Sequence, residues 1–140
     1  MTTSNNLMVA VLERLKYCQG VLNDQGMVRR EHRTNVTRAT APAVYLVDGD
    51  ESPDRGFGKC ETQTELAFTV RVFVRSDDGF SAADEIAESV MEALDPAVPY
   101  PHGAQLARGR VSRDQEIADL DVVVVEMDFV FRYVLAGWGM

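Results

Sequence analysis

The sequence lacks most of the residue patterns that indicate catalysis, metal binding or membrane insertion. Its two cysteines, Cys18 and Cys60, are far apart, fit no metal-ligand spacing and are typical of free thiols in a reducing compartment. No apolar run approaches the ~20 residues that a membrane helix needs. The N-terminal stretch has neither the basic start nor the cleavage site of a secretory signal. We therefore expect a protein that is assembled in a cytosol, with no membrane partner and no disulfide framework.

Positive charge is also scarce. The 140 residues carry 14 basic and 22 acidic side chains, for a net charge of −8. Residues 61–140 account for the imbalance, with 6 basic and 15 acidic groups. Such a chain should repel a phosphate backbone, so we predict no sequence-specific binding of nucleic acid. The one basic cluster, residues 29–38, is interrupted by Glu31, and its role is left open between a charge-guarded edge and a docking surface.

The composition is that of a single globular domain spanning residues 1–140, since 46% of the residues are hydrophobic. A first helix is predicted over residues 5–19, with Ser4 or Asn5 as its cap. Its apolar side chains recur at helical spacing, at Met8, Val11, Leu12, Leu15 and Cys18. A second helix is predicted over residues 81–94, with a capping box of Ser81 and Asp84.

Strands are predicted where apolar residues alternate or form short runs between turn residues. The predicted ranges are residues 27–33, 43–47, 64–75, 105–116 and 121–135, with loops over residues 48–63 and 95–104. The short connection between the last two strands favours antiparallel pairing. We therefore predict an α+β fold, with a mostly antiparallel sheet of about four to five strands and two helices packed on one face.

Two motifs in the acidic loop resemble ligand sites but are incomplete. Alternate oxygen ligands are present as in a calcium loop, at Asp48, Asp50, Ser52 and Asp54. The sixth position is Pro53 instead of glycine and the twelfth is Lys59 instead of glutamate, so no calcium site is predicted. The following "GFGK" lacks the upstream glycine and the final Ser or Thr of a phosphate loop. We predict no metal, no cofactor and no enzymatic activity.

The second face of the two longest strands mixes apolar and charged residues. In "DVVVVEMDFVFRYVLAGW", residues 121–138, one alternating set is apolar and suits a core, whereas the other combines valines with charged side chains. Such a mixture on strands of unusual length favours a subunit interface over simple exposure. The predicted interface residues are Arg71, Phe73, Arg75, Glu126, Asp128 and Arg132. We expect Arg71 or Arg75 to pair with Glu126 or Asp128, across strands or across subunits.

The order of these segments resembles that of the tail terminator, or minor tail, proteins of long-tailed bacteriophages and their prophage relatives. The segments that carry the resemblance are "PAVYLVDGDE", "AFTVRVFVRS", "SAADEIAESVMEAL" and "VVVVEMDFVFRYVL". The resemblance implies a non-enzymatic virion tail protein, assembled in the bacterial host cytoplasm. It also implies a homohexameric ring that caps the tail tube, ends tube polymerisation and contacts the head-tail connector protein. Loop residues that would face the tail tube protein or the connector are Asp48, Asp50, Glu51, Asp54, Arg55 and Phe57.

Two alternatives stay open at this point. One is another ring-forming neck or tail-completion protein of similar fold. The other is a small ligand-binding or enzymatic α+β domain that uses Cys60, His102 and the acidic loop. Assembly without a ligand favours the ring, whereas a monomer stabilised by a metal or small molecule favours the ligand-binding domain.

Overall fold

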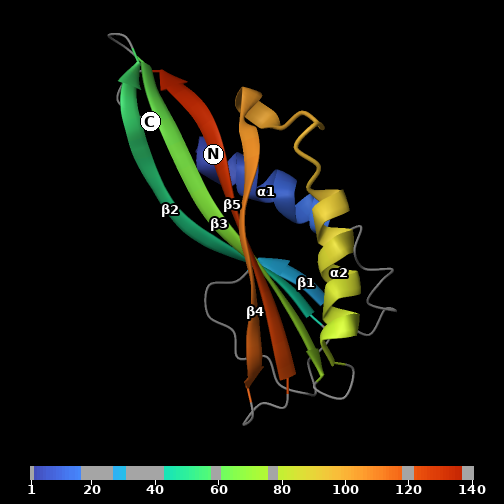
Figure 1. The fold of residues 1–140 in the computed structure, drawn as a ribbon. Coiled ribbons are helices and arrows are strands. Elements are labelled where there is room, and N and C mark those ends of the chain that lie inside the picture. Colours follow the sequence, from blue (N-terminus) through green and yellow to red (C-terminus); the bar gives the residue numbers. More distant parts are fainter. Residues whose placement is uncertain are drawn as a thin grey trace.

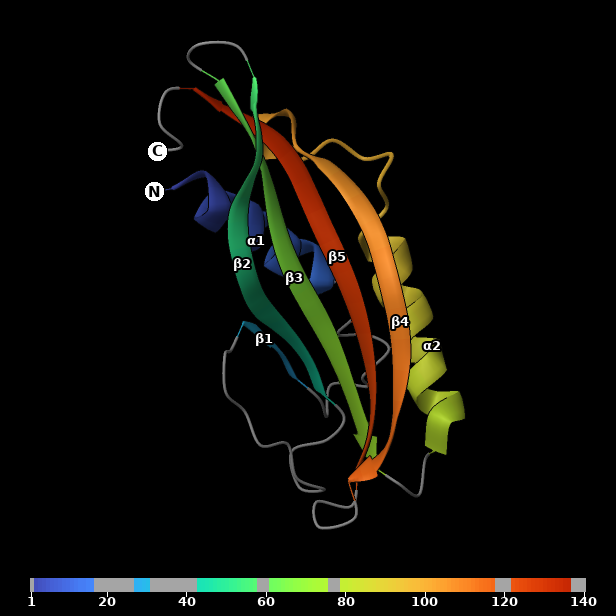
Figure 2. The same ribbon diagram turned by 60° about the vertical axis from the view of Figure 1, so that its left-hand side comes forward.

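The computed structural model describes residues 2–16, 27–30, 43–57, 61–75, 79–117 and 122–136. Along the chain the elements are α1 (Thr3–Leu15), β1 (Met27–Arg30), β2 (Ala43–Phe57), β3 (Glu61–Arg75), α2 (Gly79–Ala93), the 3-10 helix η2 (Pro101–Gly103), β4 (Gln105–Ile117) and β5 (Val122–Ala136). The strands form one sheet in the order β1-β2-β3-β5-β4 (Figures 1 and 2). The predicted α+β class is confirmed.

All neighbouring strands pair antiparallel except β1, which runs parallel to the first four residues of β2. β2, β3 and β5 are each 15 residues long, and at ~3.3 Å per residue each spans about 50 Å. The helices are much shorter, about 20 Å each at 1.5 Å per residue. Both lie on the same side of the sheet (Figure 1), as predicted, and leave its other face without a helix among the described residues.

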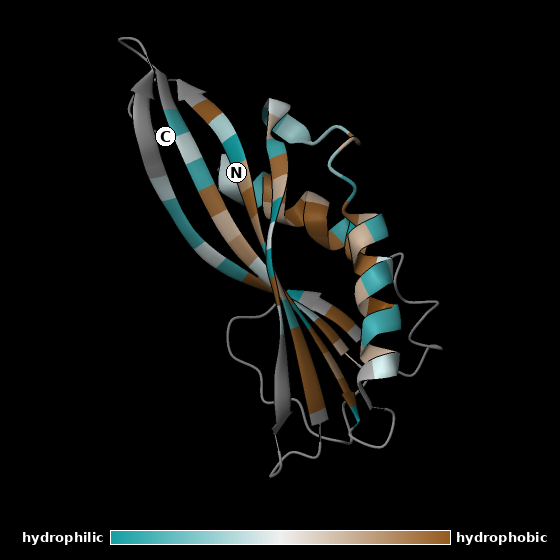
Figure 3. Ribbon diagram, in the orientation of Figure 1, coloured by the Kyte–Doolittle hydropathy of each residue, from teal (hydrophilic) through white to brown (hydrophobic). Residues whose placement is uncertain are grey.

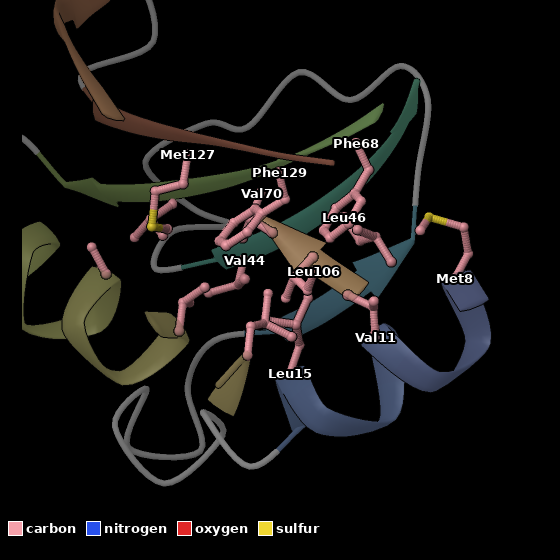
Figure 4. Close-up of a cluster of buried hydrophobic side chains, with 14 of the residues drawn as sticks. Met8, Val11, Leu15, Val44, Leu46, Phe68, Val70, Leu106, Met127 and Phe129 are labelled. Carbon is pink, nitrogen blue, oxygen red and sulfur yellow. The ribbon is translucent and has the colours of Figure 1, made fainter. Parts of the chain in front are cut away.

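The core lies between the helices and one face of the sheet. The buried side chains of α1 are Leu7, Met8, Val11 and Leu15, and they point into this layer. Figure 4 shows Val11 and Leu15 directed at the strands. Phe68 of β3 stacks on Phe129 of β5 at a ring distance of 5.2 Å, and it also contacts Phe131 at 5.4 Å. Brown and teal bands alternate along β3 and β5 in Figure 3, because successive side chains of a strand point to opposite faces. Burial of these alternate residues fixes the strand register.

The prediction of a loop over residues 48–63 is wrong for most of that range. β2 continues through Phe57, and its backbone stays paired with β3 as far as Phe57 opposite Glu61. Two bulges absorb the residues that do not suit a regular ladder, one between Asp48 and Glu51 and one between Pro53 and Arg55. Pro53 is tolerated there because it lies next to a bulge, and no described strand pairs with the other side of β2 at this point.

Both predicted helix caps are wrong. α1 begins at Thr3, and the N–H of Asn5 donates to the side-chain oxygen of Thr2 at 3.1 Å, so Thr2 is the N-cap. α1 ends at Leu15, and the predicted last apolar residue, Cys18, lies outside the described residues. α2 begins at Gly79, which places Ser81 inside the helix. Its cap would fall in residues 76–78, which are also outside the described part.

Candidate assembly surface

The face of the sheet opposite the helices is the surface that the sequence predicted as an interface. We call it the helix-free face and define it by alternate residues of β3 and β5: Glu65, Ala67, Thr69, Arg71, Phe73, Arg75, Val124, Glu126, Asp128, Val130, Arg132 and Val134. The register of β3 and β5 places all six predicted interface residues on this face. The sequence pattern therefore identified correctly which side chains share it.

Three cross-strand contacts between β3 and β5 order the charges of the helix-free face. Arg71 Nε lies 2.9 Å from Glu126 Oε1 in an ion pair, which confirms the predicted pairing across strands. Arg132 Nε donates to Glu65 Oε1 at 3.1 Å. These side chains are partly exposed, so each pair contributes no more than about 1 kcal/mol to folding. The pairs hold the charges in a fixed pattern, which favours recognition of a matching surface.

The third contact joins Thr69 to Asp128. The Thr69 hydroxyl donates to Asp128 Oδ1 at 3.0 Å, between residues that are directly opposite in the register. Asp128 is exposed, and the hydroxyl occupies one of its carboxylate oxygens. Asp128 therefore keeps acceptor capacity for a partner, whereas Arg71 and Glu126 are already matched to each other.

Phe73, one of the six predicted interface residues, is largely buried within the chain. Its side chain is 5% exposed and packs edge-on against Tyr45, with the ring centroids 5.8 Å apart. Val124, its register partner on β5, is 3% exposed. The exposed apolar surface lies instead towards the other end of the face, where Val134 is 47% exposed. A partner that contacts apolar atoms of this face would therefore do so near Val134.

The six residues predicted as a docking loop all lie in strand β2. Asp48 is held by Arg30, whereas Asp50 is exposed. Glu51 accepts a hydrogen bond from the buried Tyr133 hydroxyl. Burial is the main cause that raises the pKa of Tyr133 well above its usual range, and this hydrogen bond is the second. Asp54 lies in the second bulge of β2, and Arg55 and Phe57 lie beyond it. This segment is therefore part of a strand, and its backbone is paired with β3.

Contacts that no sequence pattern predicted hold the loop after α2. Arg14 of α1 stacks its guanidinium 3.7 Å from the centre of the Tyr100 ring and donates to the carbonyl of Pro99 at 2.5 Å. The Tyr100 ring packs edge-on against Phe131 at 5.0 Å. The Asp95 side chain accepts from the N–H of Ala97 at 2.9 Å. The predicted loop over residues 95–104 is thus attached to the core through Arg14 and Tyr100.

Little else among the described residues suggests chemistry. Within them, no group of three or more His, Cys, Asp or Glu side chains is placed to hold a metal ion. His102 lies on η2 and its Nε2 is 3.2 Å from the side-chain nitrogen of Asn6, while Cys60, its predicted companion, lies outside the described residues. In the same part of the chain, no helix combines the length and apolarity required to cross a bilayer.

Comparison with known proteins identifies the family. The family model described as tail completion protein gp17 matches residues 9–136. A chain from the virion of a native gene transfer agent (GTA) particle has a similar fold, with a TM-score of 0.62 at 21% identity, covering 95% of this chain and 96% of that one. A second solved chain gives a TM-score of 0.56 at 14% identity, covering 94% and 96%. No curated protein sequence matches significantly.

Proposed function

Because the chain belongs to the family of tail completion protein gp17 and is a structural protein of the phage tail, we propose that it forms a ring that caps the tail tube. The match over residues 9–136 is the observation that carries this proposal. Copies of the chain would associate into a closed homohexamer, end the polymerisation of the tube and present a surface to the head-tail connector protein. The role would be structural, without catalysis.

The helix-free face supports self-assembly. Its ion pairs are ordered within the chain, it carries an exposed apolar side chain at Val134, and Asp128 retains acceptor capacity. Interfaces combine such apolar and polar groups, and a fixed charge pattern selects the correct partner. Arg75 and Arg132 add positive charge to a face that also carries three acidic residues. We propose that this face contacts a neighbour in the ring, with the tail tube and the connector at the two rims.

The similarity to a chain of a gene transfer agent virion also supports a place within a particle. The net charge of −8 suits a passage for DNA, because a negative lumen would not retain a phosphate backbone. The alternative ring-forming neck protein would share the assembly but would bind a different neighbour.

The first test is the solution mass by light scattering at several protein and salt concentrations. A mass near six times the 15.5 kDa of one chain is expected. An assembly that weakens with salt would implicate exposed charges in its contacts. Tail tubes grown with the protein should then stop at shorter lengths in electron micrographs and carry a ring at one end. Tubes of unchanged length, without a terminal ring, would favour the neck protein.

The contribution of the helix-free face is tested by exchanging one ion pair. Arg71→Glu combined with Glu126→Arg keeps a pair within the chain but reverses its direction on the surface. We expect this variant to unfold at the wild-type temperature and to assemble more weakly. A variant that assembles as well as the wild type would show that this pair lies outside the interface.

A further inference from the structure

The sheet ends in two long edges that have no strand beyond them among the described residues. β4 pairs with β5 only. β1 covers only residues 43–46 of β2, so the remaining eleven residues of β2, 47–57, have β3 on one side and no described strand on the other. Figure 2 shows β2 and β4 as the two outer long strands of the curved sheet. A long uncovered edge is a template for pairing with another chain.

The strand directions allow the two edges to pair with each other. β2 is antiparallel to β3, β3 to β5 and β5 to β4, so β2 and β4 run in opposite directions. When a second copy lies beside the first in the same orientation, its β2 edge meets the first copy's β4 edge as an antiparallel pair. The two surfaces in this contact differ, so the contact is head-to-tail, and repetition about an axis closes a ring.

The two edges also overlap in height on the sheet. Across the sheet, Asp48 of β2 is opposite Phe68 of β3. Phe68 is opposite Phe129 of β5, and Phe129 is opposite Arg108 of β4. The part of β2 that β1 leaves uncovered, residues 47–57, therefore begins within one residue of the height of Arg108. Residues 107–111 of β4 are all exposed, as are residues 49–52 of β2. Through the same ladders Ser52 lies at the height of Gln105, so Asp50 and Arg110 differ in height by about two residues. A neighbour shifted by this amount along the strands, as the inclined strands of a closed ring allow, would pair over about six residues, which is the usual length of a strand.

The charges of these edge segments are opposite. Residues 47–52 of β2 contain three acidic residues and no basic one, whereas residues 105–112 of β4 contain Arg108 and Arg110 and no acidic one. Asp48 and Arg108 already have partners within the chain, Arg30 and the carbonyl of Met91. Asp50 and Arg110 are both exposed, and each lies in the bulge of its strand. These two residues are therefore the ones placed to attract a second copy.

We propose that the β4 edge of one copy pairs antiparallel with the uncovered β2 edge of the next copy, with Arg110 facing the neighbour's Asp50. The proposal rests on the ring put forward above and names the contact that joins its subunits. Closure removes both free edges, as it does in a β-barrel. Bulges and arginines also occur on edges that are protected from pairing, and the experiment distinguishes the two uses.

The test combines charge reversal with rescue. Arg110→Glu and Asp50→Arg, each alone, should raise the protein concentration needed for assembly by about tenfold or more, because each places like charges together. The two changes in one chain should restore assembly, because every contact then regains an opposite pair. Lys16→Glu and Glu85→Arg are controls of the same charge change at exposed helix-side positions. Thermal unfolding by circular dichroism checks that every variant folds.

The outcomes separate the edge contact from the ring. Normal assembly of both single variants, with a wild-type ring, would overturn the edge contact and leave the ring standing. The same holds if the single variants assemble weakly and the combination does not recover. A wild-type chain that is monomeric at all concentrations and does not bind tail tube ends would overturn the proposed function, and the edge contact with it.

Cross-linking tests the head-to-tail geometry directly. Arg110→Cys and Asp50→Cys would each be made with Cys18→Ser and Cys60→Ser, and a short bismaleimide tolerates a register shift of a residue or two. Covalent dimers are expected only when the two variants are mixed. Dimers of Arg110→Cys alone would indicate that β4 pairs with itself, and the absence of cross-links in an assembled ring would also contradict the proposal.

Discussion

At the residue scale, Arg30 connects three elements that are far apart in the chain. Its guanidinium donates from Nε to Asp48 Oδ1 at 2.8 Å, from Nη2 to the other Asp48 oxygen, and from Nη1 to Asn5 Oδ1 at 2.8 Å. The hydrogen bond to Asp48 raises the pKa of Arg30, whose guanidinium is charged at neutral pH in any case. The planar guanidinium makes this double contact with a carboxylate in a way that lysine cannot.

Replacing Arg30 should therefore cost more than removing an ordinary surface charge. Arg30→Met leaves the Asp48 carboxylate, only 20% exposed, without its main partner. We expect the free energy of unfolding to fall by about 1–3 kcal/mol, measured as a lower urea midpoint at an unchanged slope. Arg30→Met together with Asp48→Leu should recover part of the loss, because no carboxylate is then left unpaired. A loss below ~0.5 kcal/mol for the single change would show that the contact is not maintained in solution.

At the element scale, the sequence predicted the type of most elements and missed where several of them begin and end. The alternation in residues 64–75 and 121–135 was sufficient to predict β3 and β5, because one face of each is continuously buried. The sequence predicts a loop for residues 48–57 of β2 because "DGDESPDRGF" is rich in turn residues. Its strand conformation depends on pairing with β3, a contact between distant residues that local propensity does not contain.

The candidate surface was predictable to a similar extent. Alternation placed Arg71, Glu126 and Arg132 on one face, because strand geometry alone decides which residues share a face. The burial of Phe73 was not predictable, because it depends on Tyr45 of another strand. Sequence patterns also could not predict which strands lie at the two edges of the described sheet, because that depends on the order of the strands in the sheet.

The first bulge in β2, between Asp48 and Glu51, requires a glycine at position 49. A Cβ added to Gly49 would lie 2.5 Å from the backbone oxygen of Ala67, which cannot move without displacing β3. Gly49→Ala should therefore destabilise the fold by about 1–3 kcal/mol. Gly109→Ala is the matched control in the β4 bulge, where the nearest backbone oxygen, of Asp128, would be 3.1 Å away. Thermal unfolding should rank Gly49→Ala below Gly109→Ala, and the reverse order would contradict the packing described for β2.

At the scale of the whole molecule, the family resemblance that the sequence showed is confirmed by the family model over residues 9–136. The resemblance could be found from the sequence alone, because it depends on the order and length of the helices and strands, and the sequence predicts both. The neighbours of the protein in the particle could not be predicted in this way, because their surfaces belong to other chains. The described edges and face of the sheet therefore define the contacts to be tested, and the ring itself stays a proposal.

Both helices share one core with the sheet, so the chain should unfold as a single cooperative unit. Leu15 of α1 and Ile86 of α2 are 0% and 4% exposed and belong to the same apolar cluster. Leu15→Ala and Ile86→Ala should each lower the stability by about 2–5 kcal/mol, and each should shift one unfolding transition as a whole. Glu85→Ala, at an exposed position of α2, is the control and should leave that transition within ~0.5 kcal/mol of the wild type. Calorimetry at a protein concentration below that of assembly is the measurement. Two separate transitions, with each variant moving only one, would show that α1 and α2 stabilise different units and would refute a single domain spanning residues 1–140.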